Sequence, residues 1–217
     1  MRKKLLAEGL GTFFLLATVI GSGIMAERLS GGNQAVALLA NTLATGSILV
    51  VIILAFSHLS GAHFNPVVSL VMLVQNRITA GETAAYIIIQ VLAGIAGCFA
   101  AHAMFELDIL QTSTHHRYGW GQWLAEAIAT FGLIMTISGC QRFRADALPF
   151  AVGLYITAAY WFTASTSFAN PAVTIARSLT NTFSGISPTD VPAFIAAQVI
   201  GGLSAHIIMS VLLSNKR

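Results

Sequence analysis

Six stretches of mostly apolar residues alternate with short polar segments along the chain. A helix rises roughly 1.5 Å per residue, so each stretch is long enough to cross the ~30 Å hydrocarbon core of a bilayer. The stretches lie near residues 5–25, 35–56, 82–104, 121–140, 147–164 and 191–213. The pattern therefore predicts an all-α membrane protein with six transmembrane helices packed as one domain over residues 1–217.

Two further apolar runs are too short to span a bilayer, and each begins with an Asn-Pro pair. They are FNPVVSL at 64–70 and ANPAVTI at 169–175. Proline suits the first helical turn, where no backbone N–H is needed, and the preceding asparagine can cap the helix. Non-helical backbone at membrane depth is tolerated only where it is buried in protein or lines a cavity. The motifs Asn65-Pro66-Val67 and Asn170-Pro171-Ala172 therefore predict two re-entrant half-helices beside a permeation path.

The chain also repeats itself. AEGLGTFFLLATVIG at 7–21 resembles AEAIATFGLIMTISG at 125–139, and YIIIQVLAG at 86–94 resembles FIAAQVIGG at 194–202. These matches pair Glu8 with Glu126 and Gln90 with Gln198. Three full spans in each half place the second copy in the opposite orientation, so we expect an inverted repeat with halves at about 1–110 and 118–217. The two half-helices would then meet N-terminus to N-terminus near the midplane.

Composition agrees with this class of protein, because 56% of the residues are hydrophobic and only 9% are charged, against roughly 25% charged in soluble domains. The basic residues are unevenly divided between the two predicted sides of the membrane. On the side of the termini are Arg2, Lys3, Lys4, Arg77, Arg142, Arg144, Lys216 and Arg217; opposite are Arg28, Arg117 and Arg177. This bias predicts cytoplasmic termini in a multi-pass protein of the plasma (inner) membrane. The net charge of +3 follows from topology and gives no support for a nucleic-acid partner.

Over essentially its whole length the chain resembles the aquaporin, or major intrinsic protein, family. The resemblance rests on SGAHFNPVVSL, ANPAVTIARSL, the Ala-Glu repeats, Gln90 and Gln198. It implies a right-handed bundle of six tilted helices with two half-helices, assembled in the bilayer as a homotetramer with one pore per subunit. It implies no cofactor.

The resemblance also assigns roles to residues around the two motifs. Asn65 and Asn170 would lie at the pore centre, where each half-helix N-terminus carries roughly half a positive charge and repels cations. Further pore-lining positions are expected at Gly61, Ala62, His63, Ser165, Thr166 and Ser167, whose carbonyl groups would form a ladder of acceptors.

The paired acids Glu8 and Glu126 are expected to brace the re-entrant loops by accepting hydrogen bonds from backbone N–H groups, with Gln90 and Gln198 in similar roles. Carboxylates within a membrane are costly and need partners. The alternative is a proton relay in a coupled transporter.

The expected selectivity filter departs from the family pattern. The residue after the second motif is Val173, where most members have arginine, and counting by the family's spacing places Thr45, Ala158 and Ser167 in the same ring. All four are small or uncharged, so we expect a wide filter. Arg177, one turn beyond Val173, would either add a positive charge near the outer mouth or extend to the membrane interface.

A wide, weakly polar filter favours polyols, urea-like molecules and neutral metalloid hydroxides as well as water. The segment ANPAVTIARSL, with valine in place of the usual arginine, also resembles bacterial aquaporins encoded beside arsenic-resistance genes. This resemblance implies arsenite or methylated arsenicals as transported solutes. The alternatives are an anion channel of the formate and nitrite type or a coupled transporter; the spans carry no motif for an enzyme. His115 and His116 lack further ligands nearby in sequence, so no metal site is expected, and Cys98 and Cys140 are expected to pack without a disulfide.

Overall fold

The computed structural model describes residues 1–214, and every regular element in that range is a helix. Six helices are long and two, α3 and α7, are short. The long helices are α1 (Arg2–Leu29), α2 (Gln34–Ser60), α4 (Ala80–Met104), α5 (Trp120–Phe143), α6 (Leu148–Phe162) and α8 (Val191–Leu212); the short ones are α3 (Pro66–Val74) and α7 (Pro171–Arg177), and η1 (Ala145–Ala147) is a single 3-10 turn. The order long, long, short, long thus occurs twice.

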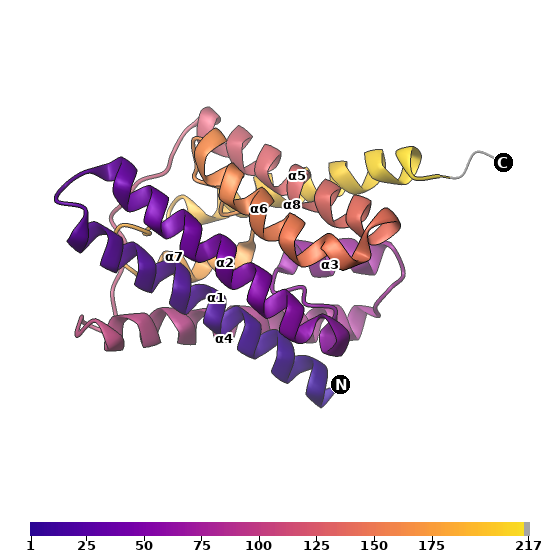
Figure 1. The fold of residues 1–217 in the computed structure, drawn as a ribbon, viewed down its shortest axis with the longest axis horizontal. Helices are drawn as coiled ribbons and strands as arrows, with labels where there is room; N and C mark the ends of the chain where they lie inside the picture. The colour runs from indigo at the N-terminus through magenta and orange to yellow at the C-terminus, as the bar shows by residue number, and fades with distance from the viewer. Residues whose placement is uncertain (215–217) are drawn as a thin grey trace.

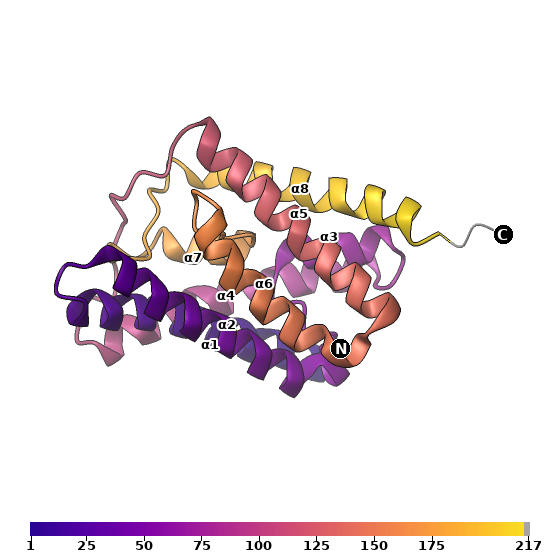
Figure 2. The same cartoon turned by 45° about the horizontal axis from the view of Figure 1, so that its top comes forward.

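The long helices run side by side along one axis, with α3 and α7 between them (Figure 1). The chain begins at the same end of the bundle at which α8 ends, and a view rotated by 45° shows the same arrangement (Figure 2). We call this the terminal end and the opposite one the distal end. The connections after α1, after α4 and after α7 lie at the distal end.

Five of the helices in the described range are long and apolar enough to cross a membrane. The predicted sixth span, at 147–164, is shorter than expected, because α6 has 15 residues. Pro149 sits in its first turn, and Thr163 is extended with φ −112° and ψ 135°, which ends the helix. The irregular segment after it leads to the second half-helix.

Glycines allow the long helices to approach closely. A Cβ on Gly97 of α4 would lie 2.3 Å from the carbonyl oxygen of Phe13 in α1, and one on Gly201 of α8 would lie 2.1 Å from that of Ala127 in α5. Small residues at such crossings let backbones touch, which favours helix association where lipid provides no hydrophobic drive. These two contacts join the same helix pair in each half of the chain.

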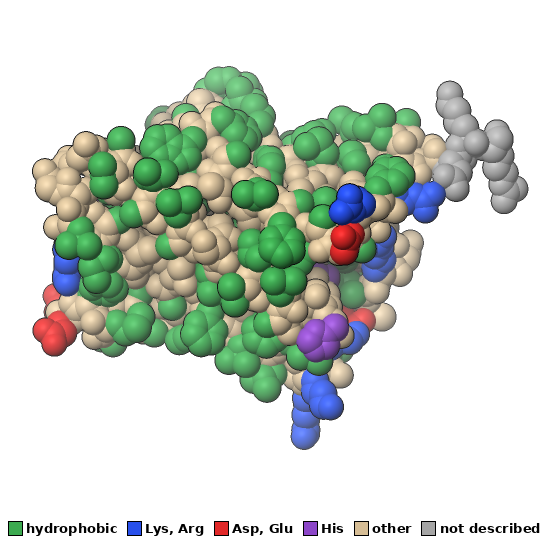
Figure 3. Space-filling model, in the orientation of Figure 1, with side chains coloured by type: hydrophobic (Ala, Val, Ile, Leu, Met, Phe, Trp, Pro, Cys, Tyr) green, Lys and Arg blue, Asp and Glu red, His purple; other side chains and the backbone are tan. Residues whose placement is uncertain are grey.

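Charged residues are concentrated at the ends of the bundle, whereas apolar side chains cover its flanks (Figure 3). Among the described residues, Arg2, Lys3, Lys4, Arg77, Arg142 and Arg144 belong to segments at the terminal end. Lys216 and Arg217, which the sequence assigned to the same side, lie outside the described residues. The apolar flanks are those of an integral membrane protein.

Candidate pore

Both half-helices begin at their Asn-Pro motif. Asn65 is extended, and its side-chain oxygen accepts a hydrogen bond from the Val67 N–H at 2.9 Å. Asn170 is also extended and accepts from the Ala172 N–H at 2.9 Å. Each asparagine therefore caps its own half-helix, as its place before a proline predicts.

The same two asparagines join the half-helices to each other. The side-chain amide of Asn65 donates to the Ala169 carbonyl oxygen at 2.8 Å, and that of Asn170 donates to the Phe64 carbonyl oxygen at 2.8 Å. These reciprocal bonds hold the two helix N-termini face to face. Since a side-chain amide has two N–H groups, each asparagine has a second donor beyond the one that joins the loops.

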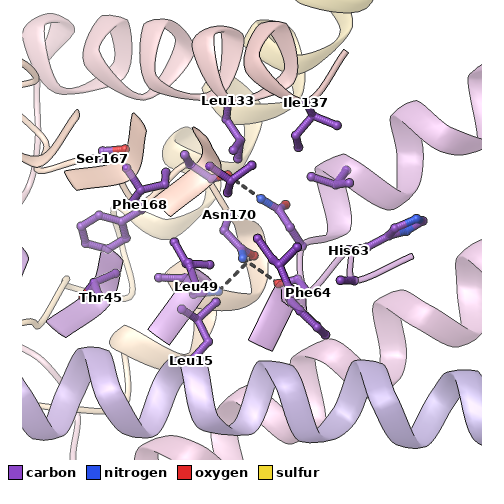
Figure 4. A pocket seen from close by; sticks show the side chains of 18 of the residues that line it. Leu15, Thr45, Leu49, His63, Phe64, Leu133, Ile137, Ser167, Phe168 and Asn170 are labelled. Carbon is purple, nitrogen blue, oxygen red and sulfur yellow. Dashed lines mark hydrogen bonds between the residues drawn. The ribbon is translucent and has the colours of Figure 1, made fainter. Parts of the chain in front are cut away.

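A narrow cavity of about 80 Å³ runs past this pair. Figure 4 shows Asn170 at its middle, with Thr45, Ser167 and Phe168 toward one side and His63 toward the other. Apolar side chains from four long helices form much of the remaining wall. They are Leu15, Val19, Leu49, Ile53, Leu133, Ile137, Leu148, Val152 and Ile156.

Glu8 contacts the loop before the first half-helix. One carboxylate oxygen accepts from the Ser60 hydroxyl at 2.6 Å and the His63 N–H at 2.9 Å. The other accepts from the Phe64 N–H at 2.7 Å and the Gln90 amide at 2.8 Å. The carboxylate is fully buried, and its environment of donors satisfies the requirement that a buried charge be hydrogen-bonded.

Glu126 makes the matching contacts with the second loop. It accepts from the N–H groups of Phe168 and Ala169 at 2.8 and 2.9 Å, and from the Gln198 amide at 2.6 Å. Gln198 also donates to Thr174 at 2.8 Å, as Gln90 donates to Ser69 at 3.1 Å. These are the contacts expected of loop-bracing groups.

The loops need such bracing because their backbones are strained. Ala62 and Phe64 have φ of 52° and 48°, and Ser167 and Ala169 have φ of 51° and 48°. Residues other than glycine rarely adopt these left-handed values, which persist only where surrounding structure enforces them. The bonds from Phe64 and Ala169 to the two carboxylates hold the strained segments in place.

The structure places three of the four predicted filter residues on the cavity wall: Thr45, Ser167 and Val173. Ala158 is a correction, because it is exposed on the outside of α6 and does not line the cavity. Tyr160 lines it instead, and its hydroxyl donates to Thr45 at 3.2 Å. The count back from the motif assumed a fixed length for the irregular segment between α6 and α7. It therefore reached a residue two positions away from the one that lines the cavity, and residues two apart on a helix face different sides.

Gly61, Ala62 and His63 line the cavity as expected, but Ser165 and Thr166 do not. Ser165 is buried, and its carbonyl oxygen accepts from the Arg117 guanidinium at 3.3 Å. That carbonyl already accepts one hydrogen bond from the protein, and because neither residue lines the cavity, the predicted ladder of carbonyl groups is shorter at the distal end.

Of the two alternatives raised by the sequence for Arg177, the structure excludes extension to the membrane interface, and a positive charge near the outer mouth stays a prediction. Arg177 is 2% exposed, so it does not extend to the membrane interface, and it does not line the cavity. Its guanidinium carbon lies 3.5 Å from the centre of the Phe168 ring, and its Nε donates to the Ser184 carbonyl oxygen. Arg117 lies 5.1 Å from the same ring. Two cations therefore surround the aromatic ring that lines the cavity.

Sequence reasoning missed Phe168 and Tyr160. The repeat carried a signal for the first, since Phe168 precedes Asn170 by two positions as His63 precedes Asn65. In the structure His63 packs edge-on against Tyr86 and Phe168 against Phe194, with ring centroids 5.2 Å apart in each pair. No comparable signal pointed to Tyr160.

The sequence also drew attention to two cysteines and two loop histidines. No group of three or more metal-binding side chains occurs within residues 1–214. Cys98 and Cys140 are free thiols. His115 and His116 are both exposed, and His116 Nδ1 lies 3.4 Å from the Asp190 carboxylate.

The fold and the cavity define a helical membrane channel with two re-entrant half-helices. The family model described as major intrinsic protein matches residues 1–142 and 120–217. The chain belongs to this family, the aquaporins, and the resemblance seen in the sequence is confirmed.

Relatives and solved structures agree. The chain is 54% identical over 217 residues to aquaglyceroporin AqpS of Rhizobium meliloti, covering 100% of this chain and 93% of the relative. It is 30% identical to aquaporin Z of Rhodopseudomonas palustris, covering 96% and 92%. The crystal structure of the aquaglyceroporin from Plasmodium falciparum superimposes with a TM-score of 0.77 at 18% identity, covering 97% of this chain and 96% of that one. This last similarity shows the fold alone, and the fold is aquaporin-like.

Proposed function

We propose that this chain is a passive channel for water and small uncharged solutes such as glycerol. The observation that carries the proposal is the pair Asn65 and Asn170, which cap two opposed half-helices in the middle of one cavity. A relative with 54% identity over the whole chain is named an aquaglyceroporin, which supports glycerol as a solute.

The distal part of the cavity suits a polyol. Thr45 and Ser167 provide hydroxyl groups, and the Ser167 hydroxyl has no hydrogen-bond partner among the described residues. Phe168 and Val173 provide apolar surface. A polyol has hydroxyl groups along one edge and C–H groups along the other, so both kinds of wall are used at once.

Cations are repelled by two features of the channel. The half-helix N-termini present positive dipole ends to the pore centre. Arg177 and Arg117 add formal charges behind the Phe168 ring, where the low dielectric strengthens repulsion of cations. We infer that these arginines replace the cation missing at Val173.

The finer assignments follow from the same reasoning. Urea and neutral metalloid hydroxides such as arsenite are small and uncharged, so the filter would admit them. The excess of basic residues at the terminal end favours cytoplasmic termini in the plasma membrane. Assembly as a homotetramer is proposed by analogy with the family to which the chain belongs. Glu8 and Glu126 serve as loop braces in this account, because their oxygens are occupied by loop donors.

Stopped-flow light scattering on proteoliposomes tests the proposal. Wild-type vesicles should equilibrate water and glycerol faster than empty vesicles. Val173→Trp should abolish both fluxes by filling the cavity, whereas Leu154→Trp, on the exposed outer face of α6, should leave them unchanged. Equal fluxes in wild-type and Val173→Trp vesicles would show that solutes take another route.

An anion channel or a proton-coupled transporter is the competing class. The former predicts conductance in planar bilayers, and the latter predicts uphill accumulation of solute. The closed set of hydrogen bonds around each buried acid disfavours a proton relay.

A further inference from the structure

The carbonyl group five residues before each motif asparagine is held by a different kind of donor in each half of the chain. In the first half, the Ser60 carbonyl oxygen accepts a hydrogen bond from the Tyr86 hydroxyl of α4 at 2.9 Å. In the second half, the corresponding Ser165 carbonyl oxygen accepts from the Arg117 guanidinium at 3.3 Å. Arg117 belongs to the distal loop, residues 105–119, which joins α4 to α5. A loop residue therefore does in one half what a helix residue does in the other.

The repeat shows why the second half uses another donor. Tyr86 aligns with Phe194 in the pair YIIIQVLAG and FIAAQVIGG. The two rings occupy matching places, because each is at most 1% exposed and packs edge-on against the side chain two positions before its motif asparagine. Phe194 has no hydroxyl group, so it cannot donate to the Ser165 carbonyl oxygen. The Arg117 guanidinium takes the place of the missing hydroxyl.

The second loop also needs firmer support than the first. Thr166 has a φ of 61° at the position where the first loop has Gly61, with a φ of 89°. Glycine adopts a left-handed backbone readily, whereas a β-branched residue rarely does so. Ser167, which follows, is also left-handed, with a φ of 51°. Two strained residues thus come directly after the carbonyl that Arg117 holds, and such strain persists only where surrounding structure enforces it.

Arg117 is itself fixed through its backbone and its side chain. Its backbone N–H donates to the Asp190 carboxylate at 2.7 Å, and its Nε donates to the Gly185 carbonyl oxygen at 2.9 Å. Gln122 contacts the same re-entrant loop by donating to the Ala164 carbonyl oxygen at 3.1 Å, but that bond is exposed. The bond from Arg117 is partly buried and lies next to the strained pair. The distal loop therefore supports the second re-entrant loop from outside the helix bundle.

The Ser167 hydroxyl in the filter depends on this support. Ser167 lines the pore cavity, and its hydroxyl has no hydrogen-bond partner among the described residues. Its direction is set by the strained backbone, which Arg117 holds through Ser165. We propose that Arg117 is a positioning residue for solute specificity, which keeps the Ser167 hydroxyl directed at a hydroxyl group of a passing polyol. This inference rests on the proposed glycerol channel.

Arg117→Met in proteoliposomes tests the proposal. Methionine retains an unbranched side chain but cannot donate, so the ratio of glycerol flux to water flux should fall by about threefold, as expected when one contact of hydrogen-bond strength is weakened. Arg28→Met is the matched control. Arg28 donates to the Phe105 carbonyl oxygen at 3.1 Å and lies 5.2 Å from the centre of that ring, and neither residue lines the cavity. The control should keep the wild-type ratio.

Adding Phe194→Tyr to Arg117→Met separates the hydrogen bond from the charge. The tyrosine supplies a neutral donor at the place that Tyr86 occupies in the first half, so the double variant should recover the wild-type flux ratio. If Arg117→Met alone does not fold, recovery of folded protein by Phe194→Tyr supports the same link. An unaltered ratio in folded Arg117→Met protein would overturn the proposal. So would a double variant that recovers neither the fold nor the ratio.

Hydrogen–deuterium exchange on the purified full chain in detergent tests the same link without transport. Arg117→Met should speed exchange of the amides in 163–170 and leave those in 61–65 unchanged, because the first loop has its own donor. Adding Phe194→Tyr should reverse the change. Equal exchange of 163–170 in wild-type and Arg117→Met protein would overturn the proposal. Wild-type vesicles without glycerol flux would instead refute the proposed function, so the two failures are distinguished.

Discussion

The two re-entrant loops are almost the same at the centre of the molecule and differ in what surrounds them. Each has a capping asparagine, a strained residue before it, and a glutamate that holds that residue's N–H. The asparagines even exchange equivalent bonds, each to the carbonyl of the residue before the other.

The surroundings diverge within a few residues. His63 in the first loop, bonded to Ser69 at 3.0 Å, corresponds to Phe168 in the second. Met72 of α3 corresponds to Arg177 of α7, which stacks on that phenylalanine. The first loop is therefore lined by a polar ring and the second by an aromatic ring backed by cations. We expect the shared centre to determine the polar contacts that every solute must make. The lining at the distal end would then determine which solutes can pass.

The largest effect is expected from removing a brace. Glu8→Leu and Glu126→Leu should each reduce folded yield severely, because they leave buried N–H groups unpaired at roughly 1–3 kcal/mol each. Glu→Gln at either position should keep the fold and much of the water flux, since the amide oxygen still accepts. Thermal unfolding in detergent with flux in vesicles measures this. Well-folded Gln and Leu variants that lose transport equally would point to proton chemistry instead.

A smaller effect is expected where the loops differ in the filter. Val173→Arg should slow glycerol and urea by about tenfold, a barrier increase of roughly 1.4 kcal/mol, because a guanidinium narrows the cavity opposite Thr45 and Ser167. Water should be slowed less. Stopped-flow ratios of glycerol to water give the answer, and an unchanged ratio, with a large change in Arg177→Ala, would refute the filter assignment.

Removing a cation behind Phe168 should change the proton leak more than the glycerol flux. Arg177→Met should raise proton leak severalfold, since a buried unit charge nearby contributes about 1–2 kcal/mol to the barrier. Arg177→Lys should restore the barrier, and Arg28→Met, at the distal end but away from the pore, should leave it unchanged. A pH-sensitive dye inside the vesicles reports the leak. If Arg177→Met and wild type leak equally, the displaced-cation idea is wrong.

The smallest effect concerns one bond that the two loops do not share. Ser60 donates to Glu8 at 2.6 Å, whereas the corresponding Ser165 makes no bond to Glu126 within the described residues. Ser60→Ala should therefore lower the free energy of unfolding by roughly 1 kcal/mol, and Ser165→Ala should change it less. Equal destabilisation of the two variants in thermal scans would show that the Ser60–Glu8 bond does not distinguish the two loops.

The sequence predicted what depends on local pattern. Hydrophobic runs located the long helices, and the Asn-Pro pairs located the first residues of α3 and α7. Ala158 was misplaced because a count along the chain cannot include the conformation of an irregular segment. The burial of Arg177 was missed because it depends on Ser184 in the long segment after α7, which has no periodic pattern.

The central claim is that opposed half-helices make a passive path for neutral solutes. The direct measurement is the final internal concentration of radiolabelled glycerol in proteoliposomes, with and without an imposed proton gradient. The account predicts rapid equilibration to the external concentration, the same in both conditions. Accumulation of glycerol above the external concentration under the proton gradient would contradict it.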